Sequence, residues 1–544
     1  MVLQPMRKVL HAMGIALLCI ALAACGTRER EVDAAAKAGI LLIGNGSEPK
    51  TLDPHLATGV PESDILRALF EGLVSQSPKN DLEAEPGVAQ SWTHNADFTR
   101  WTFTIRQNAR WSNGEPVTAG DFVYSWQRIL SPALGSEYAE MLYVLANAEA
   151  FHQGEITDFS LVGVKAPDAR TLEVTLKGST PHFPAMLKHS SFYPVYPAAV
   201  DAHGGMTDRQ SRWSTLENFV GNGPFKLSAW VTNQIIKAER SDTYWDRANV
   251  RLNAIHFFPI DNVPSEETSY MGGRLHVTST LSPDKIAWFR KNRPGELKIE
   301  PYLGTYFYRL NVTRPPLDDP RVREALNLAI DRDVLVTRVT QGGQAPATGY
   351  VPKGMAGYDG PQVLRFDPER ARKLLAEAGF PGGKGFPAKE ILINTSESHR
   401  KIAEAIQAMW RENLGIKVGI YNQEWKVYLD SQSKLDFDMS RSGWIADYAH
   451  PLTFLDMFTS GNGNNDTGWA NPDYDRLIRA AQSAGSEADR KALMEQAEAL
   501  LLRDLPIMPI YWYTKVHLRD PRIRGWGTSL LAKQPYKYMS ISAQ

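Results

Sequence analysis

The chain has 544 residues, of which 43% are hydrophobic, and its 60 basic side chains nearly balance its 61 acidic ones. This length exceeds what a single hydrophobic core usually serves, so we expect two or three domains. The balanced charge and the lack of a long Lys/Arg run argue against nucleic acid as a partner.

The N-terminus is typical of an export signal. Arg7 and Lys8 precede the apolar run AMGIALLCIALAA, which is too short to span a membrane comfortably. The run leads into LAACG, which resembles the lipobox of bacterial lipoproteins, where the cysteine is lipidated and becomes the first mature residue. The resemblance implies a signal peptide over 1–24, a lipid on Cys25 and a polar tether over 25–39. The alternative is an ordinary signal peptide with an incidental cysteine.

Strand patterns follow the N-terminal segment. β-forming residues cluster or alternate over 101–111 and 171–177, and each stretch predicts a strand. The stretch 226–240 predicts two strands around Thr232-Asn233.

Helix patterns dominate the second half of the chain. Apolar residues recur at helical spacing over 321–336 and 489–505. Two further helices are expected to stop at Gly379 and at Gly415, the second just before the strand 416–422. Interleaved strands and helices predict a mixed α/β architecture.

The motifs of common enzyme classes are absent: the chain has no HExxH, paired CxxC, GxxxxGK[ST] or GxSxG. The Gly/Asn-rich stretch SGNGNNDTGW (460–469) lacks the ordered carboxylates of a calcium loop, so we interpret it as a surface turn. We therefore expect no catalytic residues, no cofactor and no metal.

One acid lies in an unusually apolar neighbourhood. In SGWIADYAHP (442–451), Asp447 is surrounded by aromatic and aliphatic residues. A buried, ionised carboxylate without a partner is costly. Either the stretch is exposed, or a positive group pairs with Asp447.

Several phrases occur in the order found in one protein family. They include GSEPKTLDPHLATGVPESDILRALFEGLV (46–74), residues 86–130, PYLGTYFYRLN (301–311), RVREALNLAIDRD (321–333), NTSESHRKIA (394–403), NQEWKVYLD (422–430), RSGWIADY (441–448) and PIYWYTKVHL (509–518). From about residue 40 to the C-terminus, the chain resembles the oligopeptide-binding proteins of bacterial ABC peptide importers, members of the extracellular solute-binding protein family 5.

The resemblance implies a two-lobed, three-domain α/β fold: the periplasmic-binding-protein fold of type II, peptide-binding cluster, with mixed sheets and a hinge. The implied domains are a discontinuous lobe-1 domain (38–70, 197–303 and 515–544), an inserted lobe-1 domain (71–196) and a lobe-2 domain (304–514). The hinge would lie near Leu303-Gly304 and Tyr513-Lys515.

The resemblance also implies a ligand site. Asp447 would receive the α-ammonium of a peptide, an obligatory cation whatever the peptide sequence. Main chain at Val60 and at Gly443, Trp444 and Ile445 would pair with the extended ligand. Further residues matching ligand-lining positions of the family are Arg67, Tyr138, His189, Tyr302, His399, Arg441 and Tyr513.

Two of these residues are candidates for the peptide's C-terminal carboxylate. They are His399 and Arg441, each at the ligand length that suits it. From the sequence alone, His399 also fits a polar residue at a helix N-terminus, because SESHRK looks like a capping region.

Four positions depart from the family pattern. Thr58 and Arg309 stand where well-known members have acids, and Thr340 and Gln432 stand where they have cations. Arg309 would favour acidic ligand side chains if it faces the pocket, because opposite charges attract. The alternative is that it turns outward or pairs with a protein acid.

The interpretation is a periplasmic, lipid-anchored substrate-binding protein that captures oligopeptides and delivers them to the permease of an ABC transporter in the inner membrane. We expect a monomer that binds no nucleic acid and touches the membrane through its lipid. Alternatives are a binder of murein peptides, a binder of another solute such as nickel or a sugar on the same fold, and a peptidase.

Overall fold

The computed structural model describes residues 29–78, 83–527 and 529–543. The predicted signal peptide and Cys25 lie outside these residues. Within the described ranges, no helix combines the length and the apolar character needed to cross a membrane.

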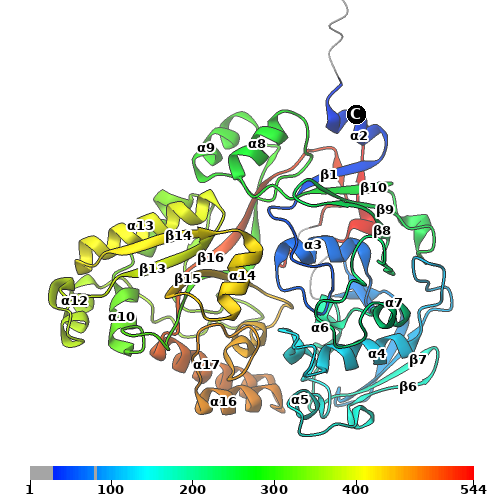
Figure 1. The fold of residues 1–544 in the computed structure, drawn as a ribbon, viewed down its shortest axis with the longest axis horizontal. Helices are drawn as coiled ribbons and strands as arrows, with labels where there is room; N and C mark the ends of the chain where they lie inside the picture. Colours follow the sequence, from blue (N-terminus) through cyan, green and yellow to red (C-terminus); the bar gives the residue numbers. More distant parts are fainter. Residues whose placement is uncertain (1–28, 79–82, 528, 544) are drawn as a thin grey trace, which may run out of the picture.

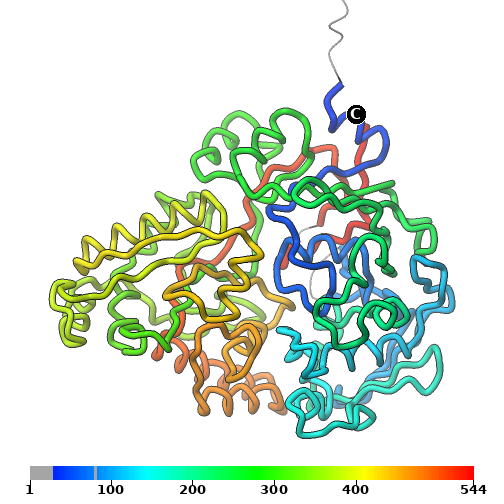
Figure 2. The backbone as a smooth tube through the Cα atoms, viewed as in Figure 1, coloured from blue at the N-terminus to red at the C-terminus, as the bar shows by residue number. Residues whose placement is uncertain are grey.

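Two lobes lie side by side (Figure 1). The blue-to-green first part of the chain builds one lobe, and the yellow and orange segments build the other, as the backbone path in Figure 2 also shows. Two long antiparallel strands, β11 (Leu297–Leu310) and β16 (Ile507–Leu518), run from beneath α8 and α9 into the second lobe. The two-lobed, mixed α/β fold expected from the sequence is confirmed.

The first lobe holds two four-stranded sheets and one short hairpin. Their strands are β1 (Ile40–Gly44), β10 (Ala254–Phe258), β9 (Ile235–Arg240) and β8 (Phe225–Val231) in one sheet, β4 (Ala89–His94), β5 (Arg100–Ile105), β7 (Thr171–Thr175) and β6 (Val164–Asp168) in the other, and β2 (Val74–Gln76) with β3 (Ala84–Pro86). Its helices are α2 (Glu31–Lys37), α3 (Val60–Leu69), α4 (Ala119–Leu130), α5 (Ala148–His152), α6 (Phe183–Met186), α7 (Pro197–Ala202), α8 (Val263–Met271) and α9 (Pro283–Asn292).

The second lobe is built on a six-stranded mixed sheet. The strand order is β12 (Ala345–Pro346), β16, β11, β15 (Met439–Ile445), β13 (Lys389–Asn394) and β14 (Val418–Gln423). Its helices are α10 (Pro320–Leu328), α11 (Arg332–Val334), α12 (Pro368–Glu377), α13 (Glu397–Leu414), α14 (Trp425–Ser433), α15 (Leu452–Leu455), α16 (Pro472–Gln482) and α17 (Glu487–Asp504). Near the C-terminus, β17 (Ile523–Arg524) pairs with β18 (Ser540–Ile541).

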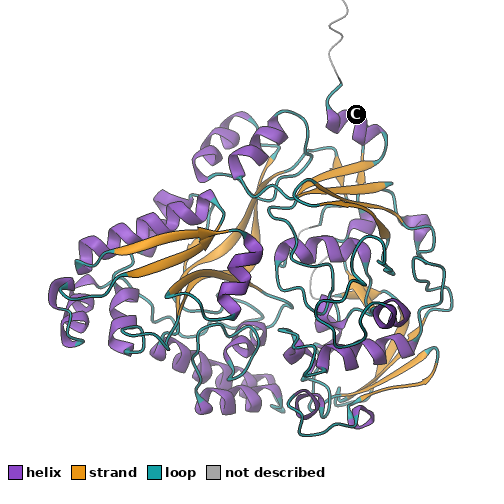
Figure 3. Ribbon diagram, in the orientation of Figure 1, coloured by secondary structure: helices purple, strands orange, loops and turns teal. Residues whose placement is uncertain are grey.

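Helices cover both faces of this sheet (Figure 3). Alternate residues of β11 point to opposite faces, as strand geometry requires. Tyr306 and Tyr308 enter the core shared with α10, α12 and α13, whereas Phe307 packs on the other side against Tyr350 and Phe458. The sheet is thus buried on both sides and forms a rigid support for the strands that reach the first lobe.

Most predicted elements are confirmed. The strand β7 forms as expected, whereas the strand predicted over 101–111 is formed only in its first half, because β5 ends at Ile105. The strands β8 and β9 flank a turn in which Asn233 has φ 58°. The helices before Gly379 and Gly415 stop as predicted, because each glycine adopts a positive φ, of 97° and 73°, that other residues rarely tolerate. The pattern over 321–336, however, is divided. Helix α10 ends at Leu328, and Asp331 caps the next turn by accepting from the Val334 N–H.

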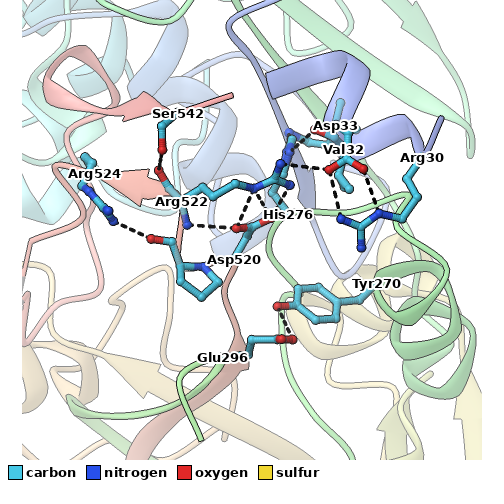
Figure 4. A network of polar contacts seen from close by, with 12 residues as sticks. Arg30, Val32, Asp33, Tyr270, His276, Glu296, Asp520, Arg522, Arg524 and Ser542 are labelled. Carbon is cyan, nitrogen blue, oxygen red and sulfur yellow. Dashed lines mark hydrogen bonds and ion pairs between the residues drawn. The ribbon is translucent and has the colours of Figure 1, made fainter. Parts of the chain in front are cut away.

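The predicted tether 25–39 is wrong in its second half. Residues 31–37 form helix α2, whose Val32 and Ala36 lie one turn apart and are buried. Figure 4 shows the polar contacts that hold it. Arg522 donates from Nη1 to Asp33 at 2.9 Å, and His276 Nε2 lies 2.9 Å from the Val32 carbonyl. This small apolar stripe, too short to stand out in the sequence, attaches the segment to the first lobe.

Between the lobes, the pairing of β11 with β16 is interrupted. Pro301 pairs with Thr514 and Thr305 pairs with Trp512, so β11 carries extra residues at this point. Such a bulge weakens the ladder locally and bends the strand. The interruption includes Leu303-Gly304, where the hinge is predicted; the hinge and the domain boundaries stay predictions.

Candidate functional site: a cavity between the lobes

A cavity of about 390 Å³ lies between the two lobes. All the predicted ligand-lining residues except His399 line it: Thr58, Val60, Arg67, Tyr138 and His189 from the first lobe, Tyr302 and Tyr513 from the strands that join the lobes, and Arg309, Gln432, Arg441, Gly443, Trp444, Ile445 and Asp447 from the second. The structure therefore brings together residues that are spread from Thr58 to Tyr513 in the sequence.

Asp447 is held in one orientation at the end of β15. Its side chain is buried, with 7% of the residue exposed. The Asp447 N–H donates to the Thr453 hydroxyl oxygen at 2.9 Å, and this hydroxyl donates back to Oδ2 at 3.2 Å. On the other side, His189 Nε2 from the first lobe lies 3.2 Å from Oδ1. The carboxylate thus contacts both lobes.

The partners of this carboxylate are neutral or weakly polar. Burial lowers the pKa of His189, and the opposing effect of Asp447 is smaller, so the imidazole is neutral near pH 7. Tyr138 donates to Asp447 Oδ1 at a long 3.5 Å. Among the described residues, no Lys or Arg nitrogen lies within 4.0 Å of the Asp447 carboxylate. Lys533, which also lines the cavity, donates from its ammonium to the Asp447 main-chain carbonyl at 2.6 Å. The buried carboxylate itself therefore remains free to pair with a positive group from outside the chain.

Aromatic rings border the carboxylate. The ring of Tyr138 lies 4.8 Å from that of His189 and 6.0 Å from that of Trp444, measured between centroids. Trp444 is fixed by a hydrogen bond from its Nε1 to the Thr453 carbonyl at 2.7 Å. Aromatic faces beside a carboxylate suit a cationic group such as an ammonium.

Arg441 lies six residues before Asp447, about 20 Å away along an extended strand. Its guanidinium donates to Asn394 at 3.2 Å and to the Tyr513 hydroxyl at 3.0 Å, and it lies 5.0 Å from the ring centre of Tyr306. No acidic oxygen of the described residues lies within 4.0 Å of it, and its Nε has no hydrogen-bond partner among them. The cavity wall therefore carries a cation that is not compensated by a protein acid.

The main chain between these two charges faces the cavity. Strand β15 pairs with β11 along its whole length, but with β13 only at Met439 and Ser440. Beyond Ser440, this edge of β15 has no strand partner among the described residues. At Gly443, a Cβ would lie 2.5 Å from the Tyr513 hydroxyl oxygen, so a larger residue would displace Tyr513. The open edge can accept an additional extended segment.

Arg309 is already paired. It is 5% exposed, donates from Nη1 to Asp466, and donates from Nη2 to the Asn464 carbonyl at 3.0 Å. Of its two predicted roles, the structure therefore shows the pairing with a protein acid. Thr58 and Gln432 line the cavity, whereas Thr340 lies outside the lining and donates to Gln344 at 2.9 Å.

His399 is placed behind the cavity wall. It lies in the first turn of α13, with its ring centroid 5.6 Å from that of Tyr306. Burial, and then the charge of Arg441, lower its pKa well below 6.5, so it is neutral. A neutral imidazole that does not line the cavity is a weaker candidate for a carboxylate than Arg441.

The stretch 460–469 forms turns, as its composition suggested, but only part of it is exposed. Asn464 is 6% exposed and donates from Nδ2 to the Glu137 carbonyl at 2.7 Å and to Glu140 Oε1 at 3.0 Å, both in the first lobe. Asp466 lines the cavity and pairs with Arg309. Gly/Asn-rich composition predicts the turn but says nothing of what packs on it.

A second, smaller cavity of about 50 Å³ shares Trp444 and Asp447 with the first. Carboxyl groups of both lobes line it, Glu140 from the first lobe and Asp456 from the second. Burial raises their pKa values to about 8 and about 7. Among the described residues, no cluster of three or more His, Cys, Asp or Glu side chains could hold a metal ion.

Residues 83–466 match the model of the bacterial extracellular solute-binding proteins, family 5 (middle region). The chain belongs to this family. Over 497 residues it is 40% identical to the periplasmic oligopeptide-binding protein OppA of Salmonella typhimurium, with 89% of each protein covered. The family consists of solute-binding proteins, and the Salmonella relative is a periplasmic oligopeptide-binding protein.

Solved structures agree with this assignment. The Haemophilus influenzae OppA complex with the peptide RPPGFSPFR superposes with a TM-score of 0.88 at 34% identity, covering 93% of this chain and 99% of that one. The Escherichia coli murein tripeptide binding protein MppA gives 0.87 at 35% identity, with 92% and 98% covered. The unliganded open form of MppA, at the same identity and with 93% and 98% covered, gives only 0.61. The lobes of this protein are therefore not arranged as in that open form.

Proposed function

We propose that this family member is the substrate-binding component of an ABC importer and that it encloses oligopeptides between its lobes. One observation carries the proposal: a buried anion, Asp447, and a cation, Arg441, line one cavity, and no Lys, Arg, Asp or Glu among the described residues forms an ion pair within 4.0 Å with either side chain. A peptide has one ammonium and one carboxylate whatever its sequence, so these two groups complement both of its ends.

The open edge of β15 supplies the remaining recognition. A peptide extended along Gly443, Trp444 and Ile445 would add strand-like hydrogen bonds that do not depend on its side chains. Val60, at the start of α3 in the first lobe, is 41% exposed and lines the same cavity, so its main chain can contribute from the other side. This geometry favours peptides over a sugar or a metal ion.

Calorimetry with matched peptides tests the proposal. Mature protein is titrated with a tri- or tetrapeptide, with its N-acetylated form and with its C-amidated form. We expect tight binding of the free peptide and large losses for both blocked forms. Equal binding of the acetylated and the free peptide would contradict the role of Asp447. A murein tripeptide belongs in the same series, because MppA is named as a binder of that ligand.

We also propose that the protein acts without catalysis. The described residues offer no metal cluster, and the sequence has no common hydrolase motif. After incubation with the protein, mass spectrometry should recover the peptide intact; accumulating fragments would favour a peptidase.

The location follows from the N-terminal sequence. We propose a monomeric periplasmic protein that is anchored by a lipid on Cys25 and delivers peptides to a permease in the inner membrane. A Cys25→Ser variant should leave the membrane fraction, since the rest of the sequence offers no other long apolar segment. Retention of this variant in the membrane pellet would exclude the lipid anchor.

A further inference from the structure

One part of the cavity lies beside the strands that join the lobes. We call it the hinge-side recess and define it by Arg67, Tyr302, Lys515, Trp526 and Tyr536, all of which line the cavity. The Lys515 ammonium lies 5.8 Å from the ring centre of Tyr302. The recess therefore combines aromatic walls with two cationic side chains.

The other charges around this recess are compensated within the protein. Arg67 pairs with Asp64, one turn earlier in α3. Glu300 lies opposite Lys515 in the β11–β16 register, but its Oε1 accepts a hydrogen bond from Arg519 at 3.0 Å. These two pairs cancel, so neither gives the recess a net charge.

Lys515 has no such partner. No acidic oxygen of the described residues lies within 4.0 Å of its ammonium, although it shares a strand pair with Glu300. Glu266 also interacts electrostatically with Lys515. Both Glu266 oxygens accept hydrogen bonds from Ser279, at 2.9 and 2.8 Å, and burial raises the Glu266 pKa to about 7, so this group is only partly ionised. The recess carries the net positive charge of Lys515.

We infer that Lys515 makes the protein favour peptides with an Asp or Glu side chain in the hinge-side recess. This inference rests on the proposed function and names the substrate class of the same cavity. An acidic side chain at contact distance pairs with the lysine, whereas a basic one is repelled. Water in the cavity screens the interaction, so we expect a preference of about five- to tenfold.

A charge-scanning peptide series tests the inference. Each position of an alanine-based peptide is changed in turn to Glu, Gln or Lys, and affinities are measured by calorimetry for the wild type, Lys515→Gln and Lys515→Arg. At one position the wild type should bind the Glu peptide about five- to tenfold more tightly than the Gln peptide. Lys515→Gln should lose this preference, and Lys515→Arg should keep it.

The matched control is Lys298→Gln. Lys298 lies on β11 near Lys515 but does not line the cavity, and its ammonium donates to the Gly295 carbonyl. Removing it changes the net charge equally and should leave the Glu preference unchanged. Raising the salt concentration should shrink the wild-type preference, and this measurement needs no variant.

The outcomes distinguish a failure of the proposed function from a failure of the inference about Lys515. If no free peptide binds, the proposed function fails. If peptides bind but the wild type ranks Glu and Gln alike at every position, the inference about Lys515 is wrong while the proposed function stands. A Glu preference that persists in Lys515→Gln also overturns the inference.

Discussion

Asp447 and Arg309 are two charged residues on the wall of one cavity, and they differ in how their charges are compensated. Both are buried, with 7% and 5% of their surface exposed. Asp447 is surrounded by a neutral imidazole and hydroxyl groups, whereas Arg309 is paired with Asp466 and bonded to the Asn464 carbonyl. A charge is available to a ligand only where the protein leaves it uncompensated. By this criterion we propose that Asp447 is a recognition group and that Arg309 is a structural one.

The largest expected effect concerns Asp447. In Asp447→Asn, the shape of the side chain is retained and the charge is lost, so a bound ammonium would be buried without a counter-ion. We expect affinity for free peptides to fall by about 2–5 kcal/mol, the usual cost of truncating one partner of a desolvated charge pair. Calorimetry measures this directly.

The control for this variant is the ligand itself. An N-acetylated peptide has no ammonium, so Asp447→Asn should bind it no more weakly than the wild type does. If the variant loses equal affinity for acetylated and free peptides, Asp447 supports the fold of the site and does not bind the amine.

The second prediction concerns Arg309 and its pairing with Asp466. Asp466→Asn leaves the Arg309 guanidinium buried without its acid, and we expect the free energy of unfolding to fall by about 1–3 kcal/mol. Arg309→Gln combined with Asp466→Asn should recover part of this loss, because no unpaired charge remains. Chemical denaturation of the two variants and the wild type measures both effects.

A surface pair provides the control. Asp436 is 77% exposed in its side chain and lies 3.3 Å from Arg314, so Asp436→Asn should change stability by less than about 0.5 kcal/mol. If Asp466→Asn is as mild as this surface variant, Arg309 is not held by its pairing and the comparison with Asp447 fails.

Local sequence signals predicted the elements that depend on local physics. The turn between β8 and β9 needs a residue that tolerates positive φ, and Asn233 supplies it. The ends of α12 and α13 need glycine for the same reason. The family resemblance located the cavity residues because ordered phrases, such as the one around Asp447, identify positions of a known fold.

The pairing of charges could not be predicted in the same way. Arg309 and Asp466 are 157 positions apart, and nothing local to either residue shows that they meet. The burial of Asn464 against the first lobe depends on how the lobes are arranged, as does the neutral state of His189 beside Asp447. Sequence reasoning identified which groups are charged; the structure was needed to show which charges remain open to a ligand.

The third prediction uses the smaller cavity behind Asp447. Glu140 and Asp456 come from opposite lobes, so separating the lobes would hydrate both and return their pKa values toward 4.5 and 3.8. Around them, Asn464 donates to Glu140, and Gln482 donates to Asp456, with Lys177 nearby. In this structure, which we take as the closed form because both lobes line the two cavities, burial raises the pKa values to about 8 and about 7. The closed form thus binds more protons than the open form.

Because the closed form binds more protons, peptide affinity should decrease as the pH rises. Protonated carboxyl groups are buried without penalty at low pH, and the cost of closure grows as the pH rises from about 5 through the closed-form pKa values near 7 and 8. Peptide affinity should therefore fall by about tenfold or more between pH 6 and 8. Glu140→Gln should flatten this profile. Proton uptake on binding, measured by calorimetry in buffers of different ionisation enthalpy, checks it independently; a profile equally steep in the variant would exclude Glu140 as the group responsible.

The smallest expected effect returns to Arg309. Because Asp466 compensates its charge, Arg309 should not make the cavity favour acidic ligand side chains, although its replacement of a family acid suggested this from the sequence. The informative variant is Arg309→Gln with Asp466→Asn, which removes the pair and keeps the net charge of the wall. We expect its ranking of Glu, Gln and Lys peptides to stay within about twofold of the wild type, since the opposite charges of Arg309 and Asp466 largely cancel at a ligand side chain. Arg309→Gln alone is a poorer probe, because it leaves Asp466 as a new uncompensated acid. If the double variant loses an acidic preference that Lys515→Gln retains, then Arg309 and not Lys515 sets the charge selectivity, and pairing is not the property that separates Arg309 from Asp447.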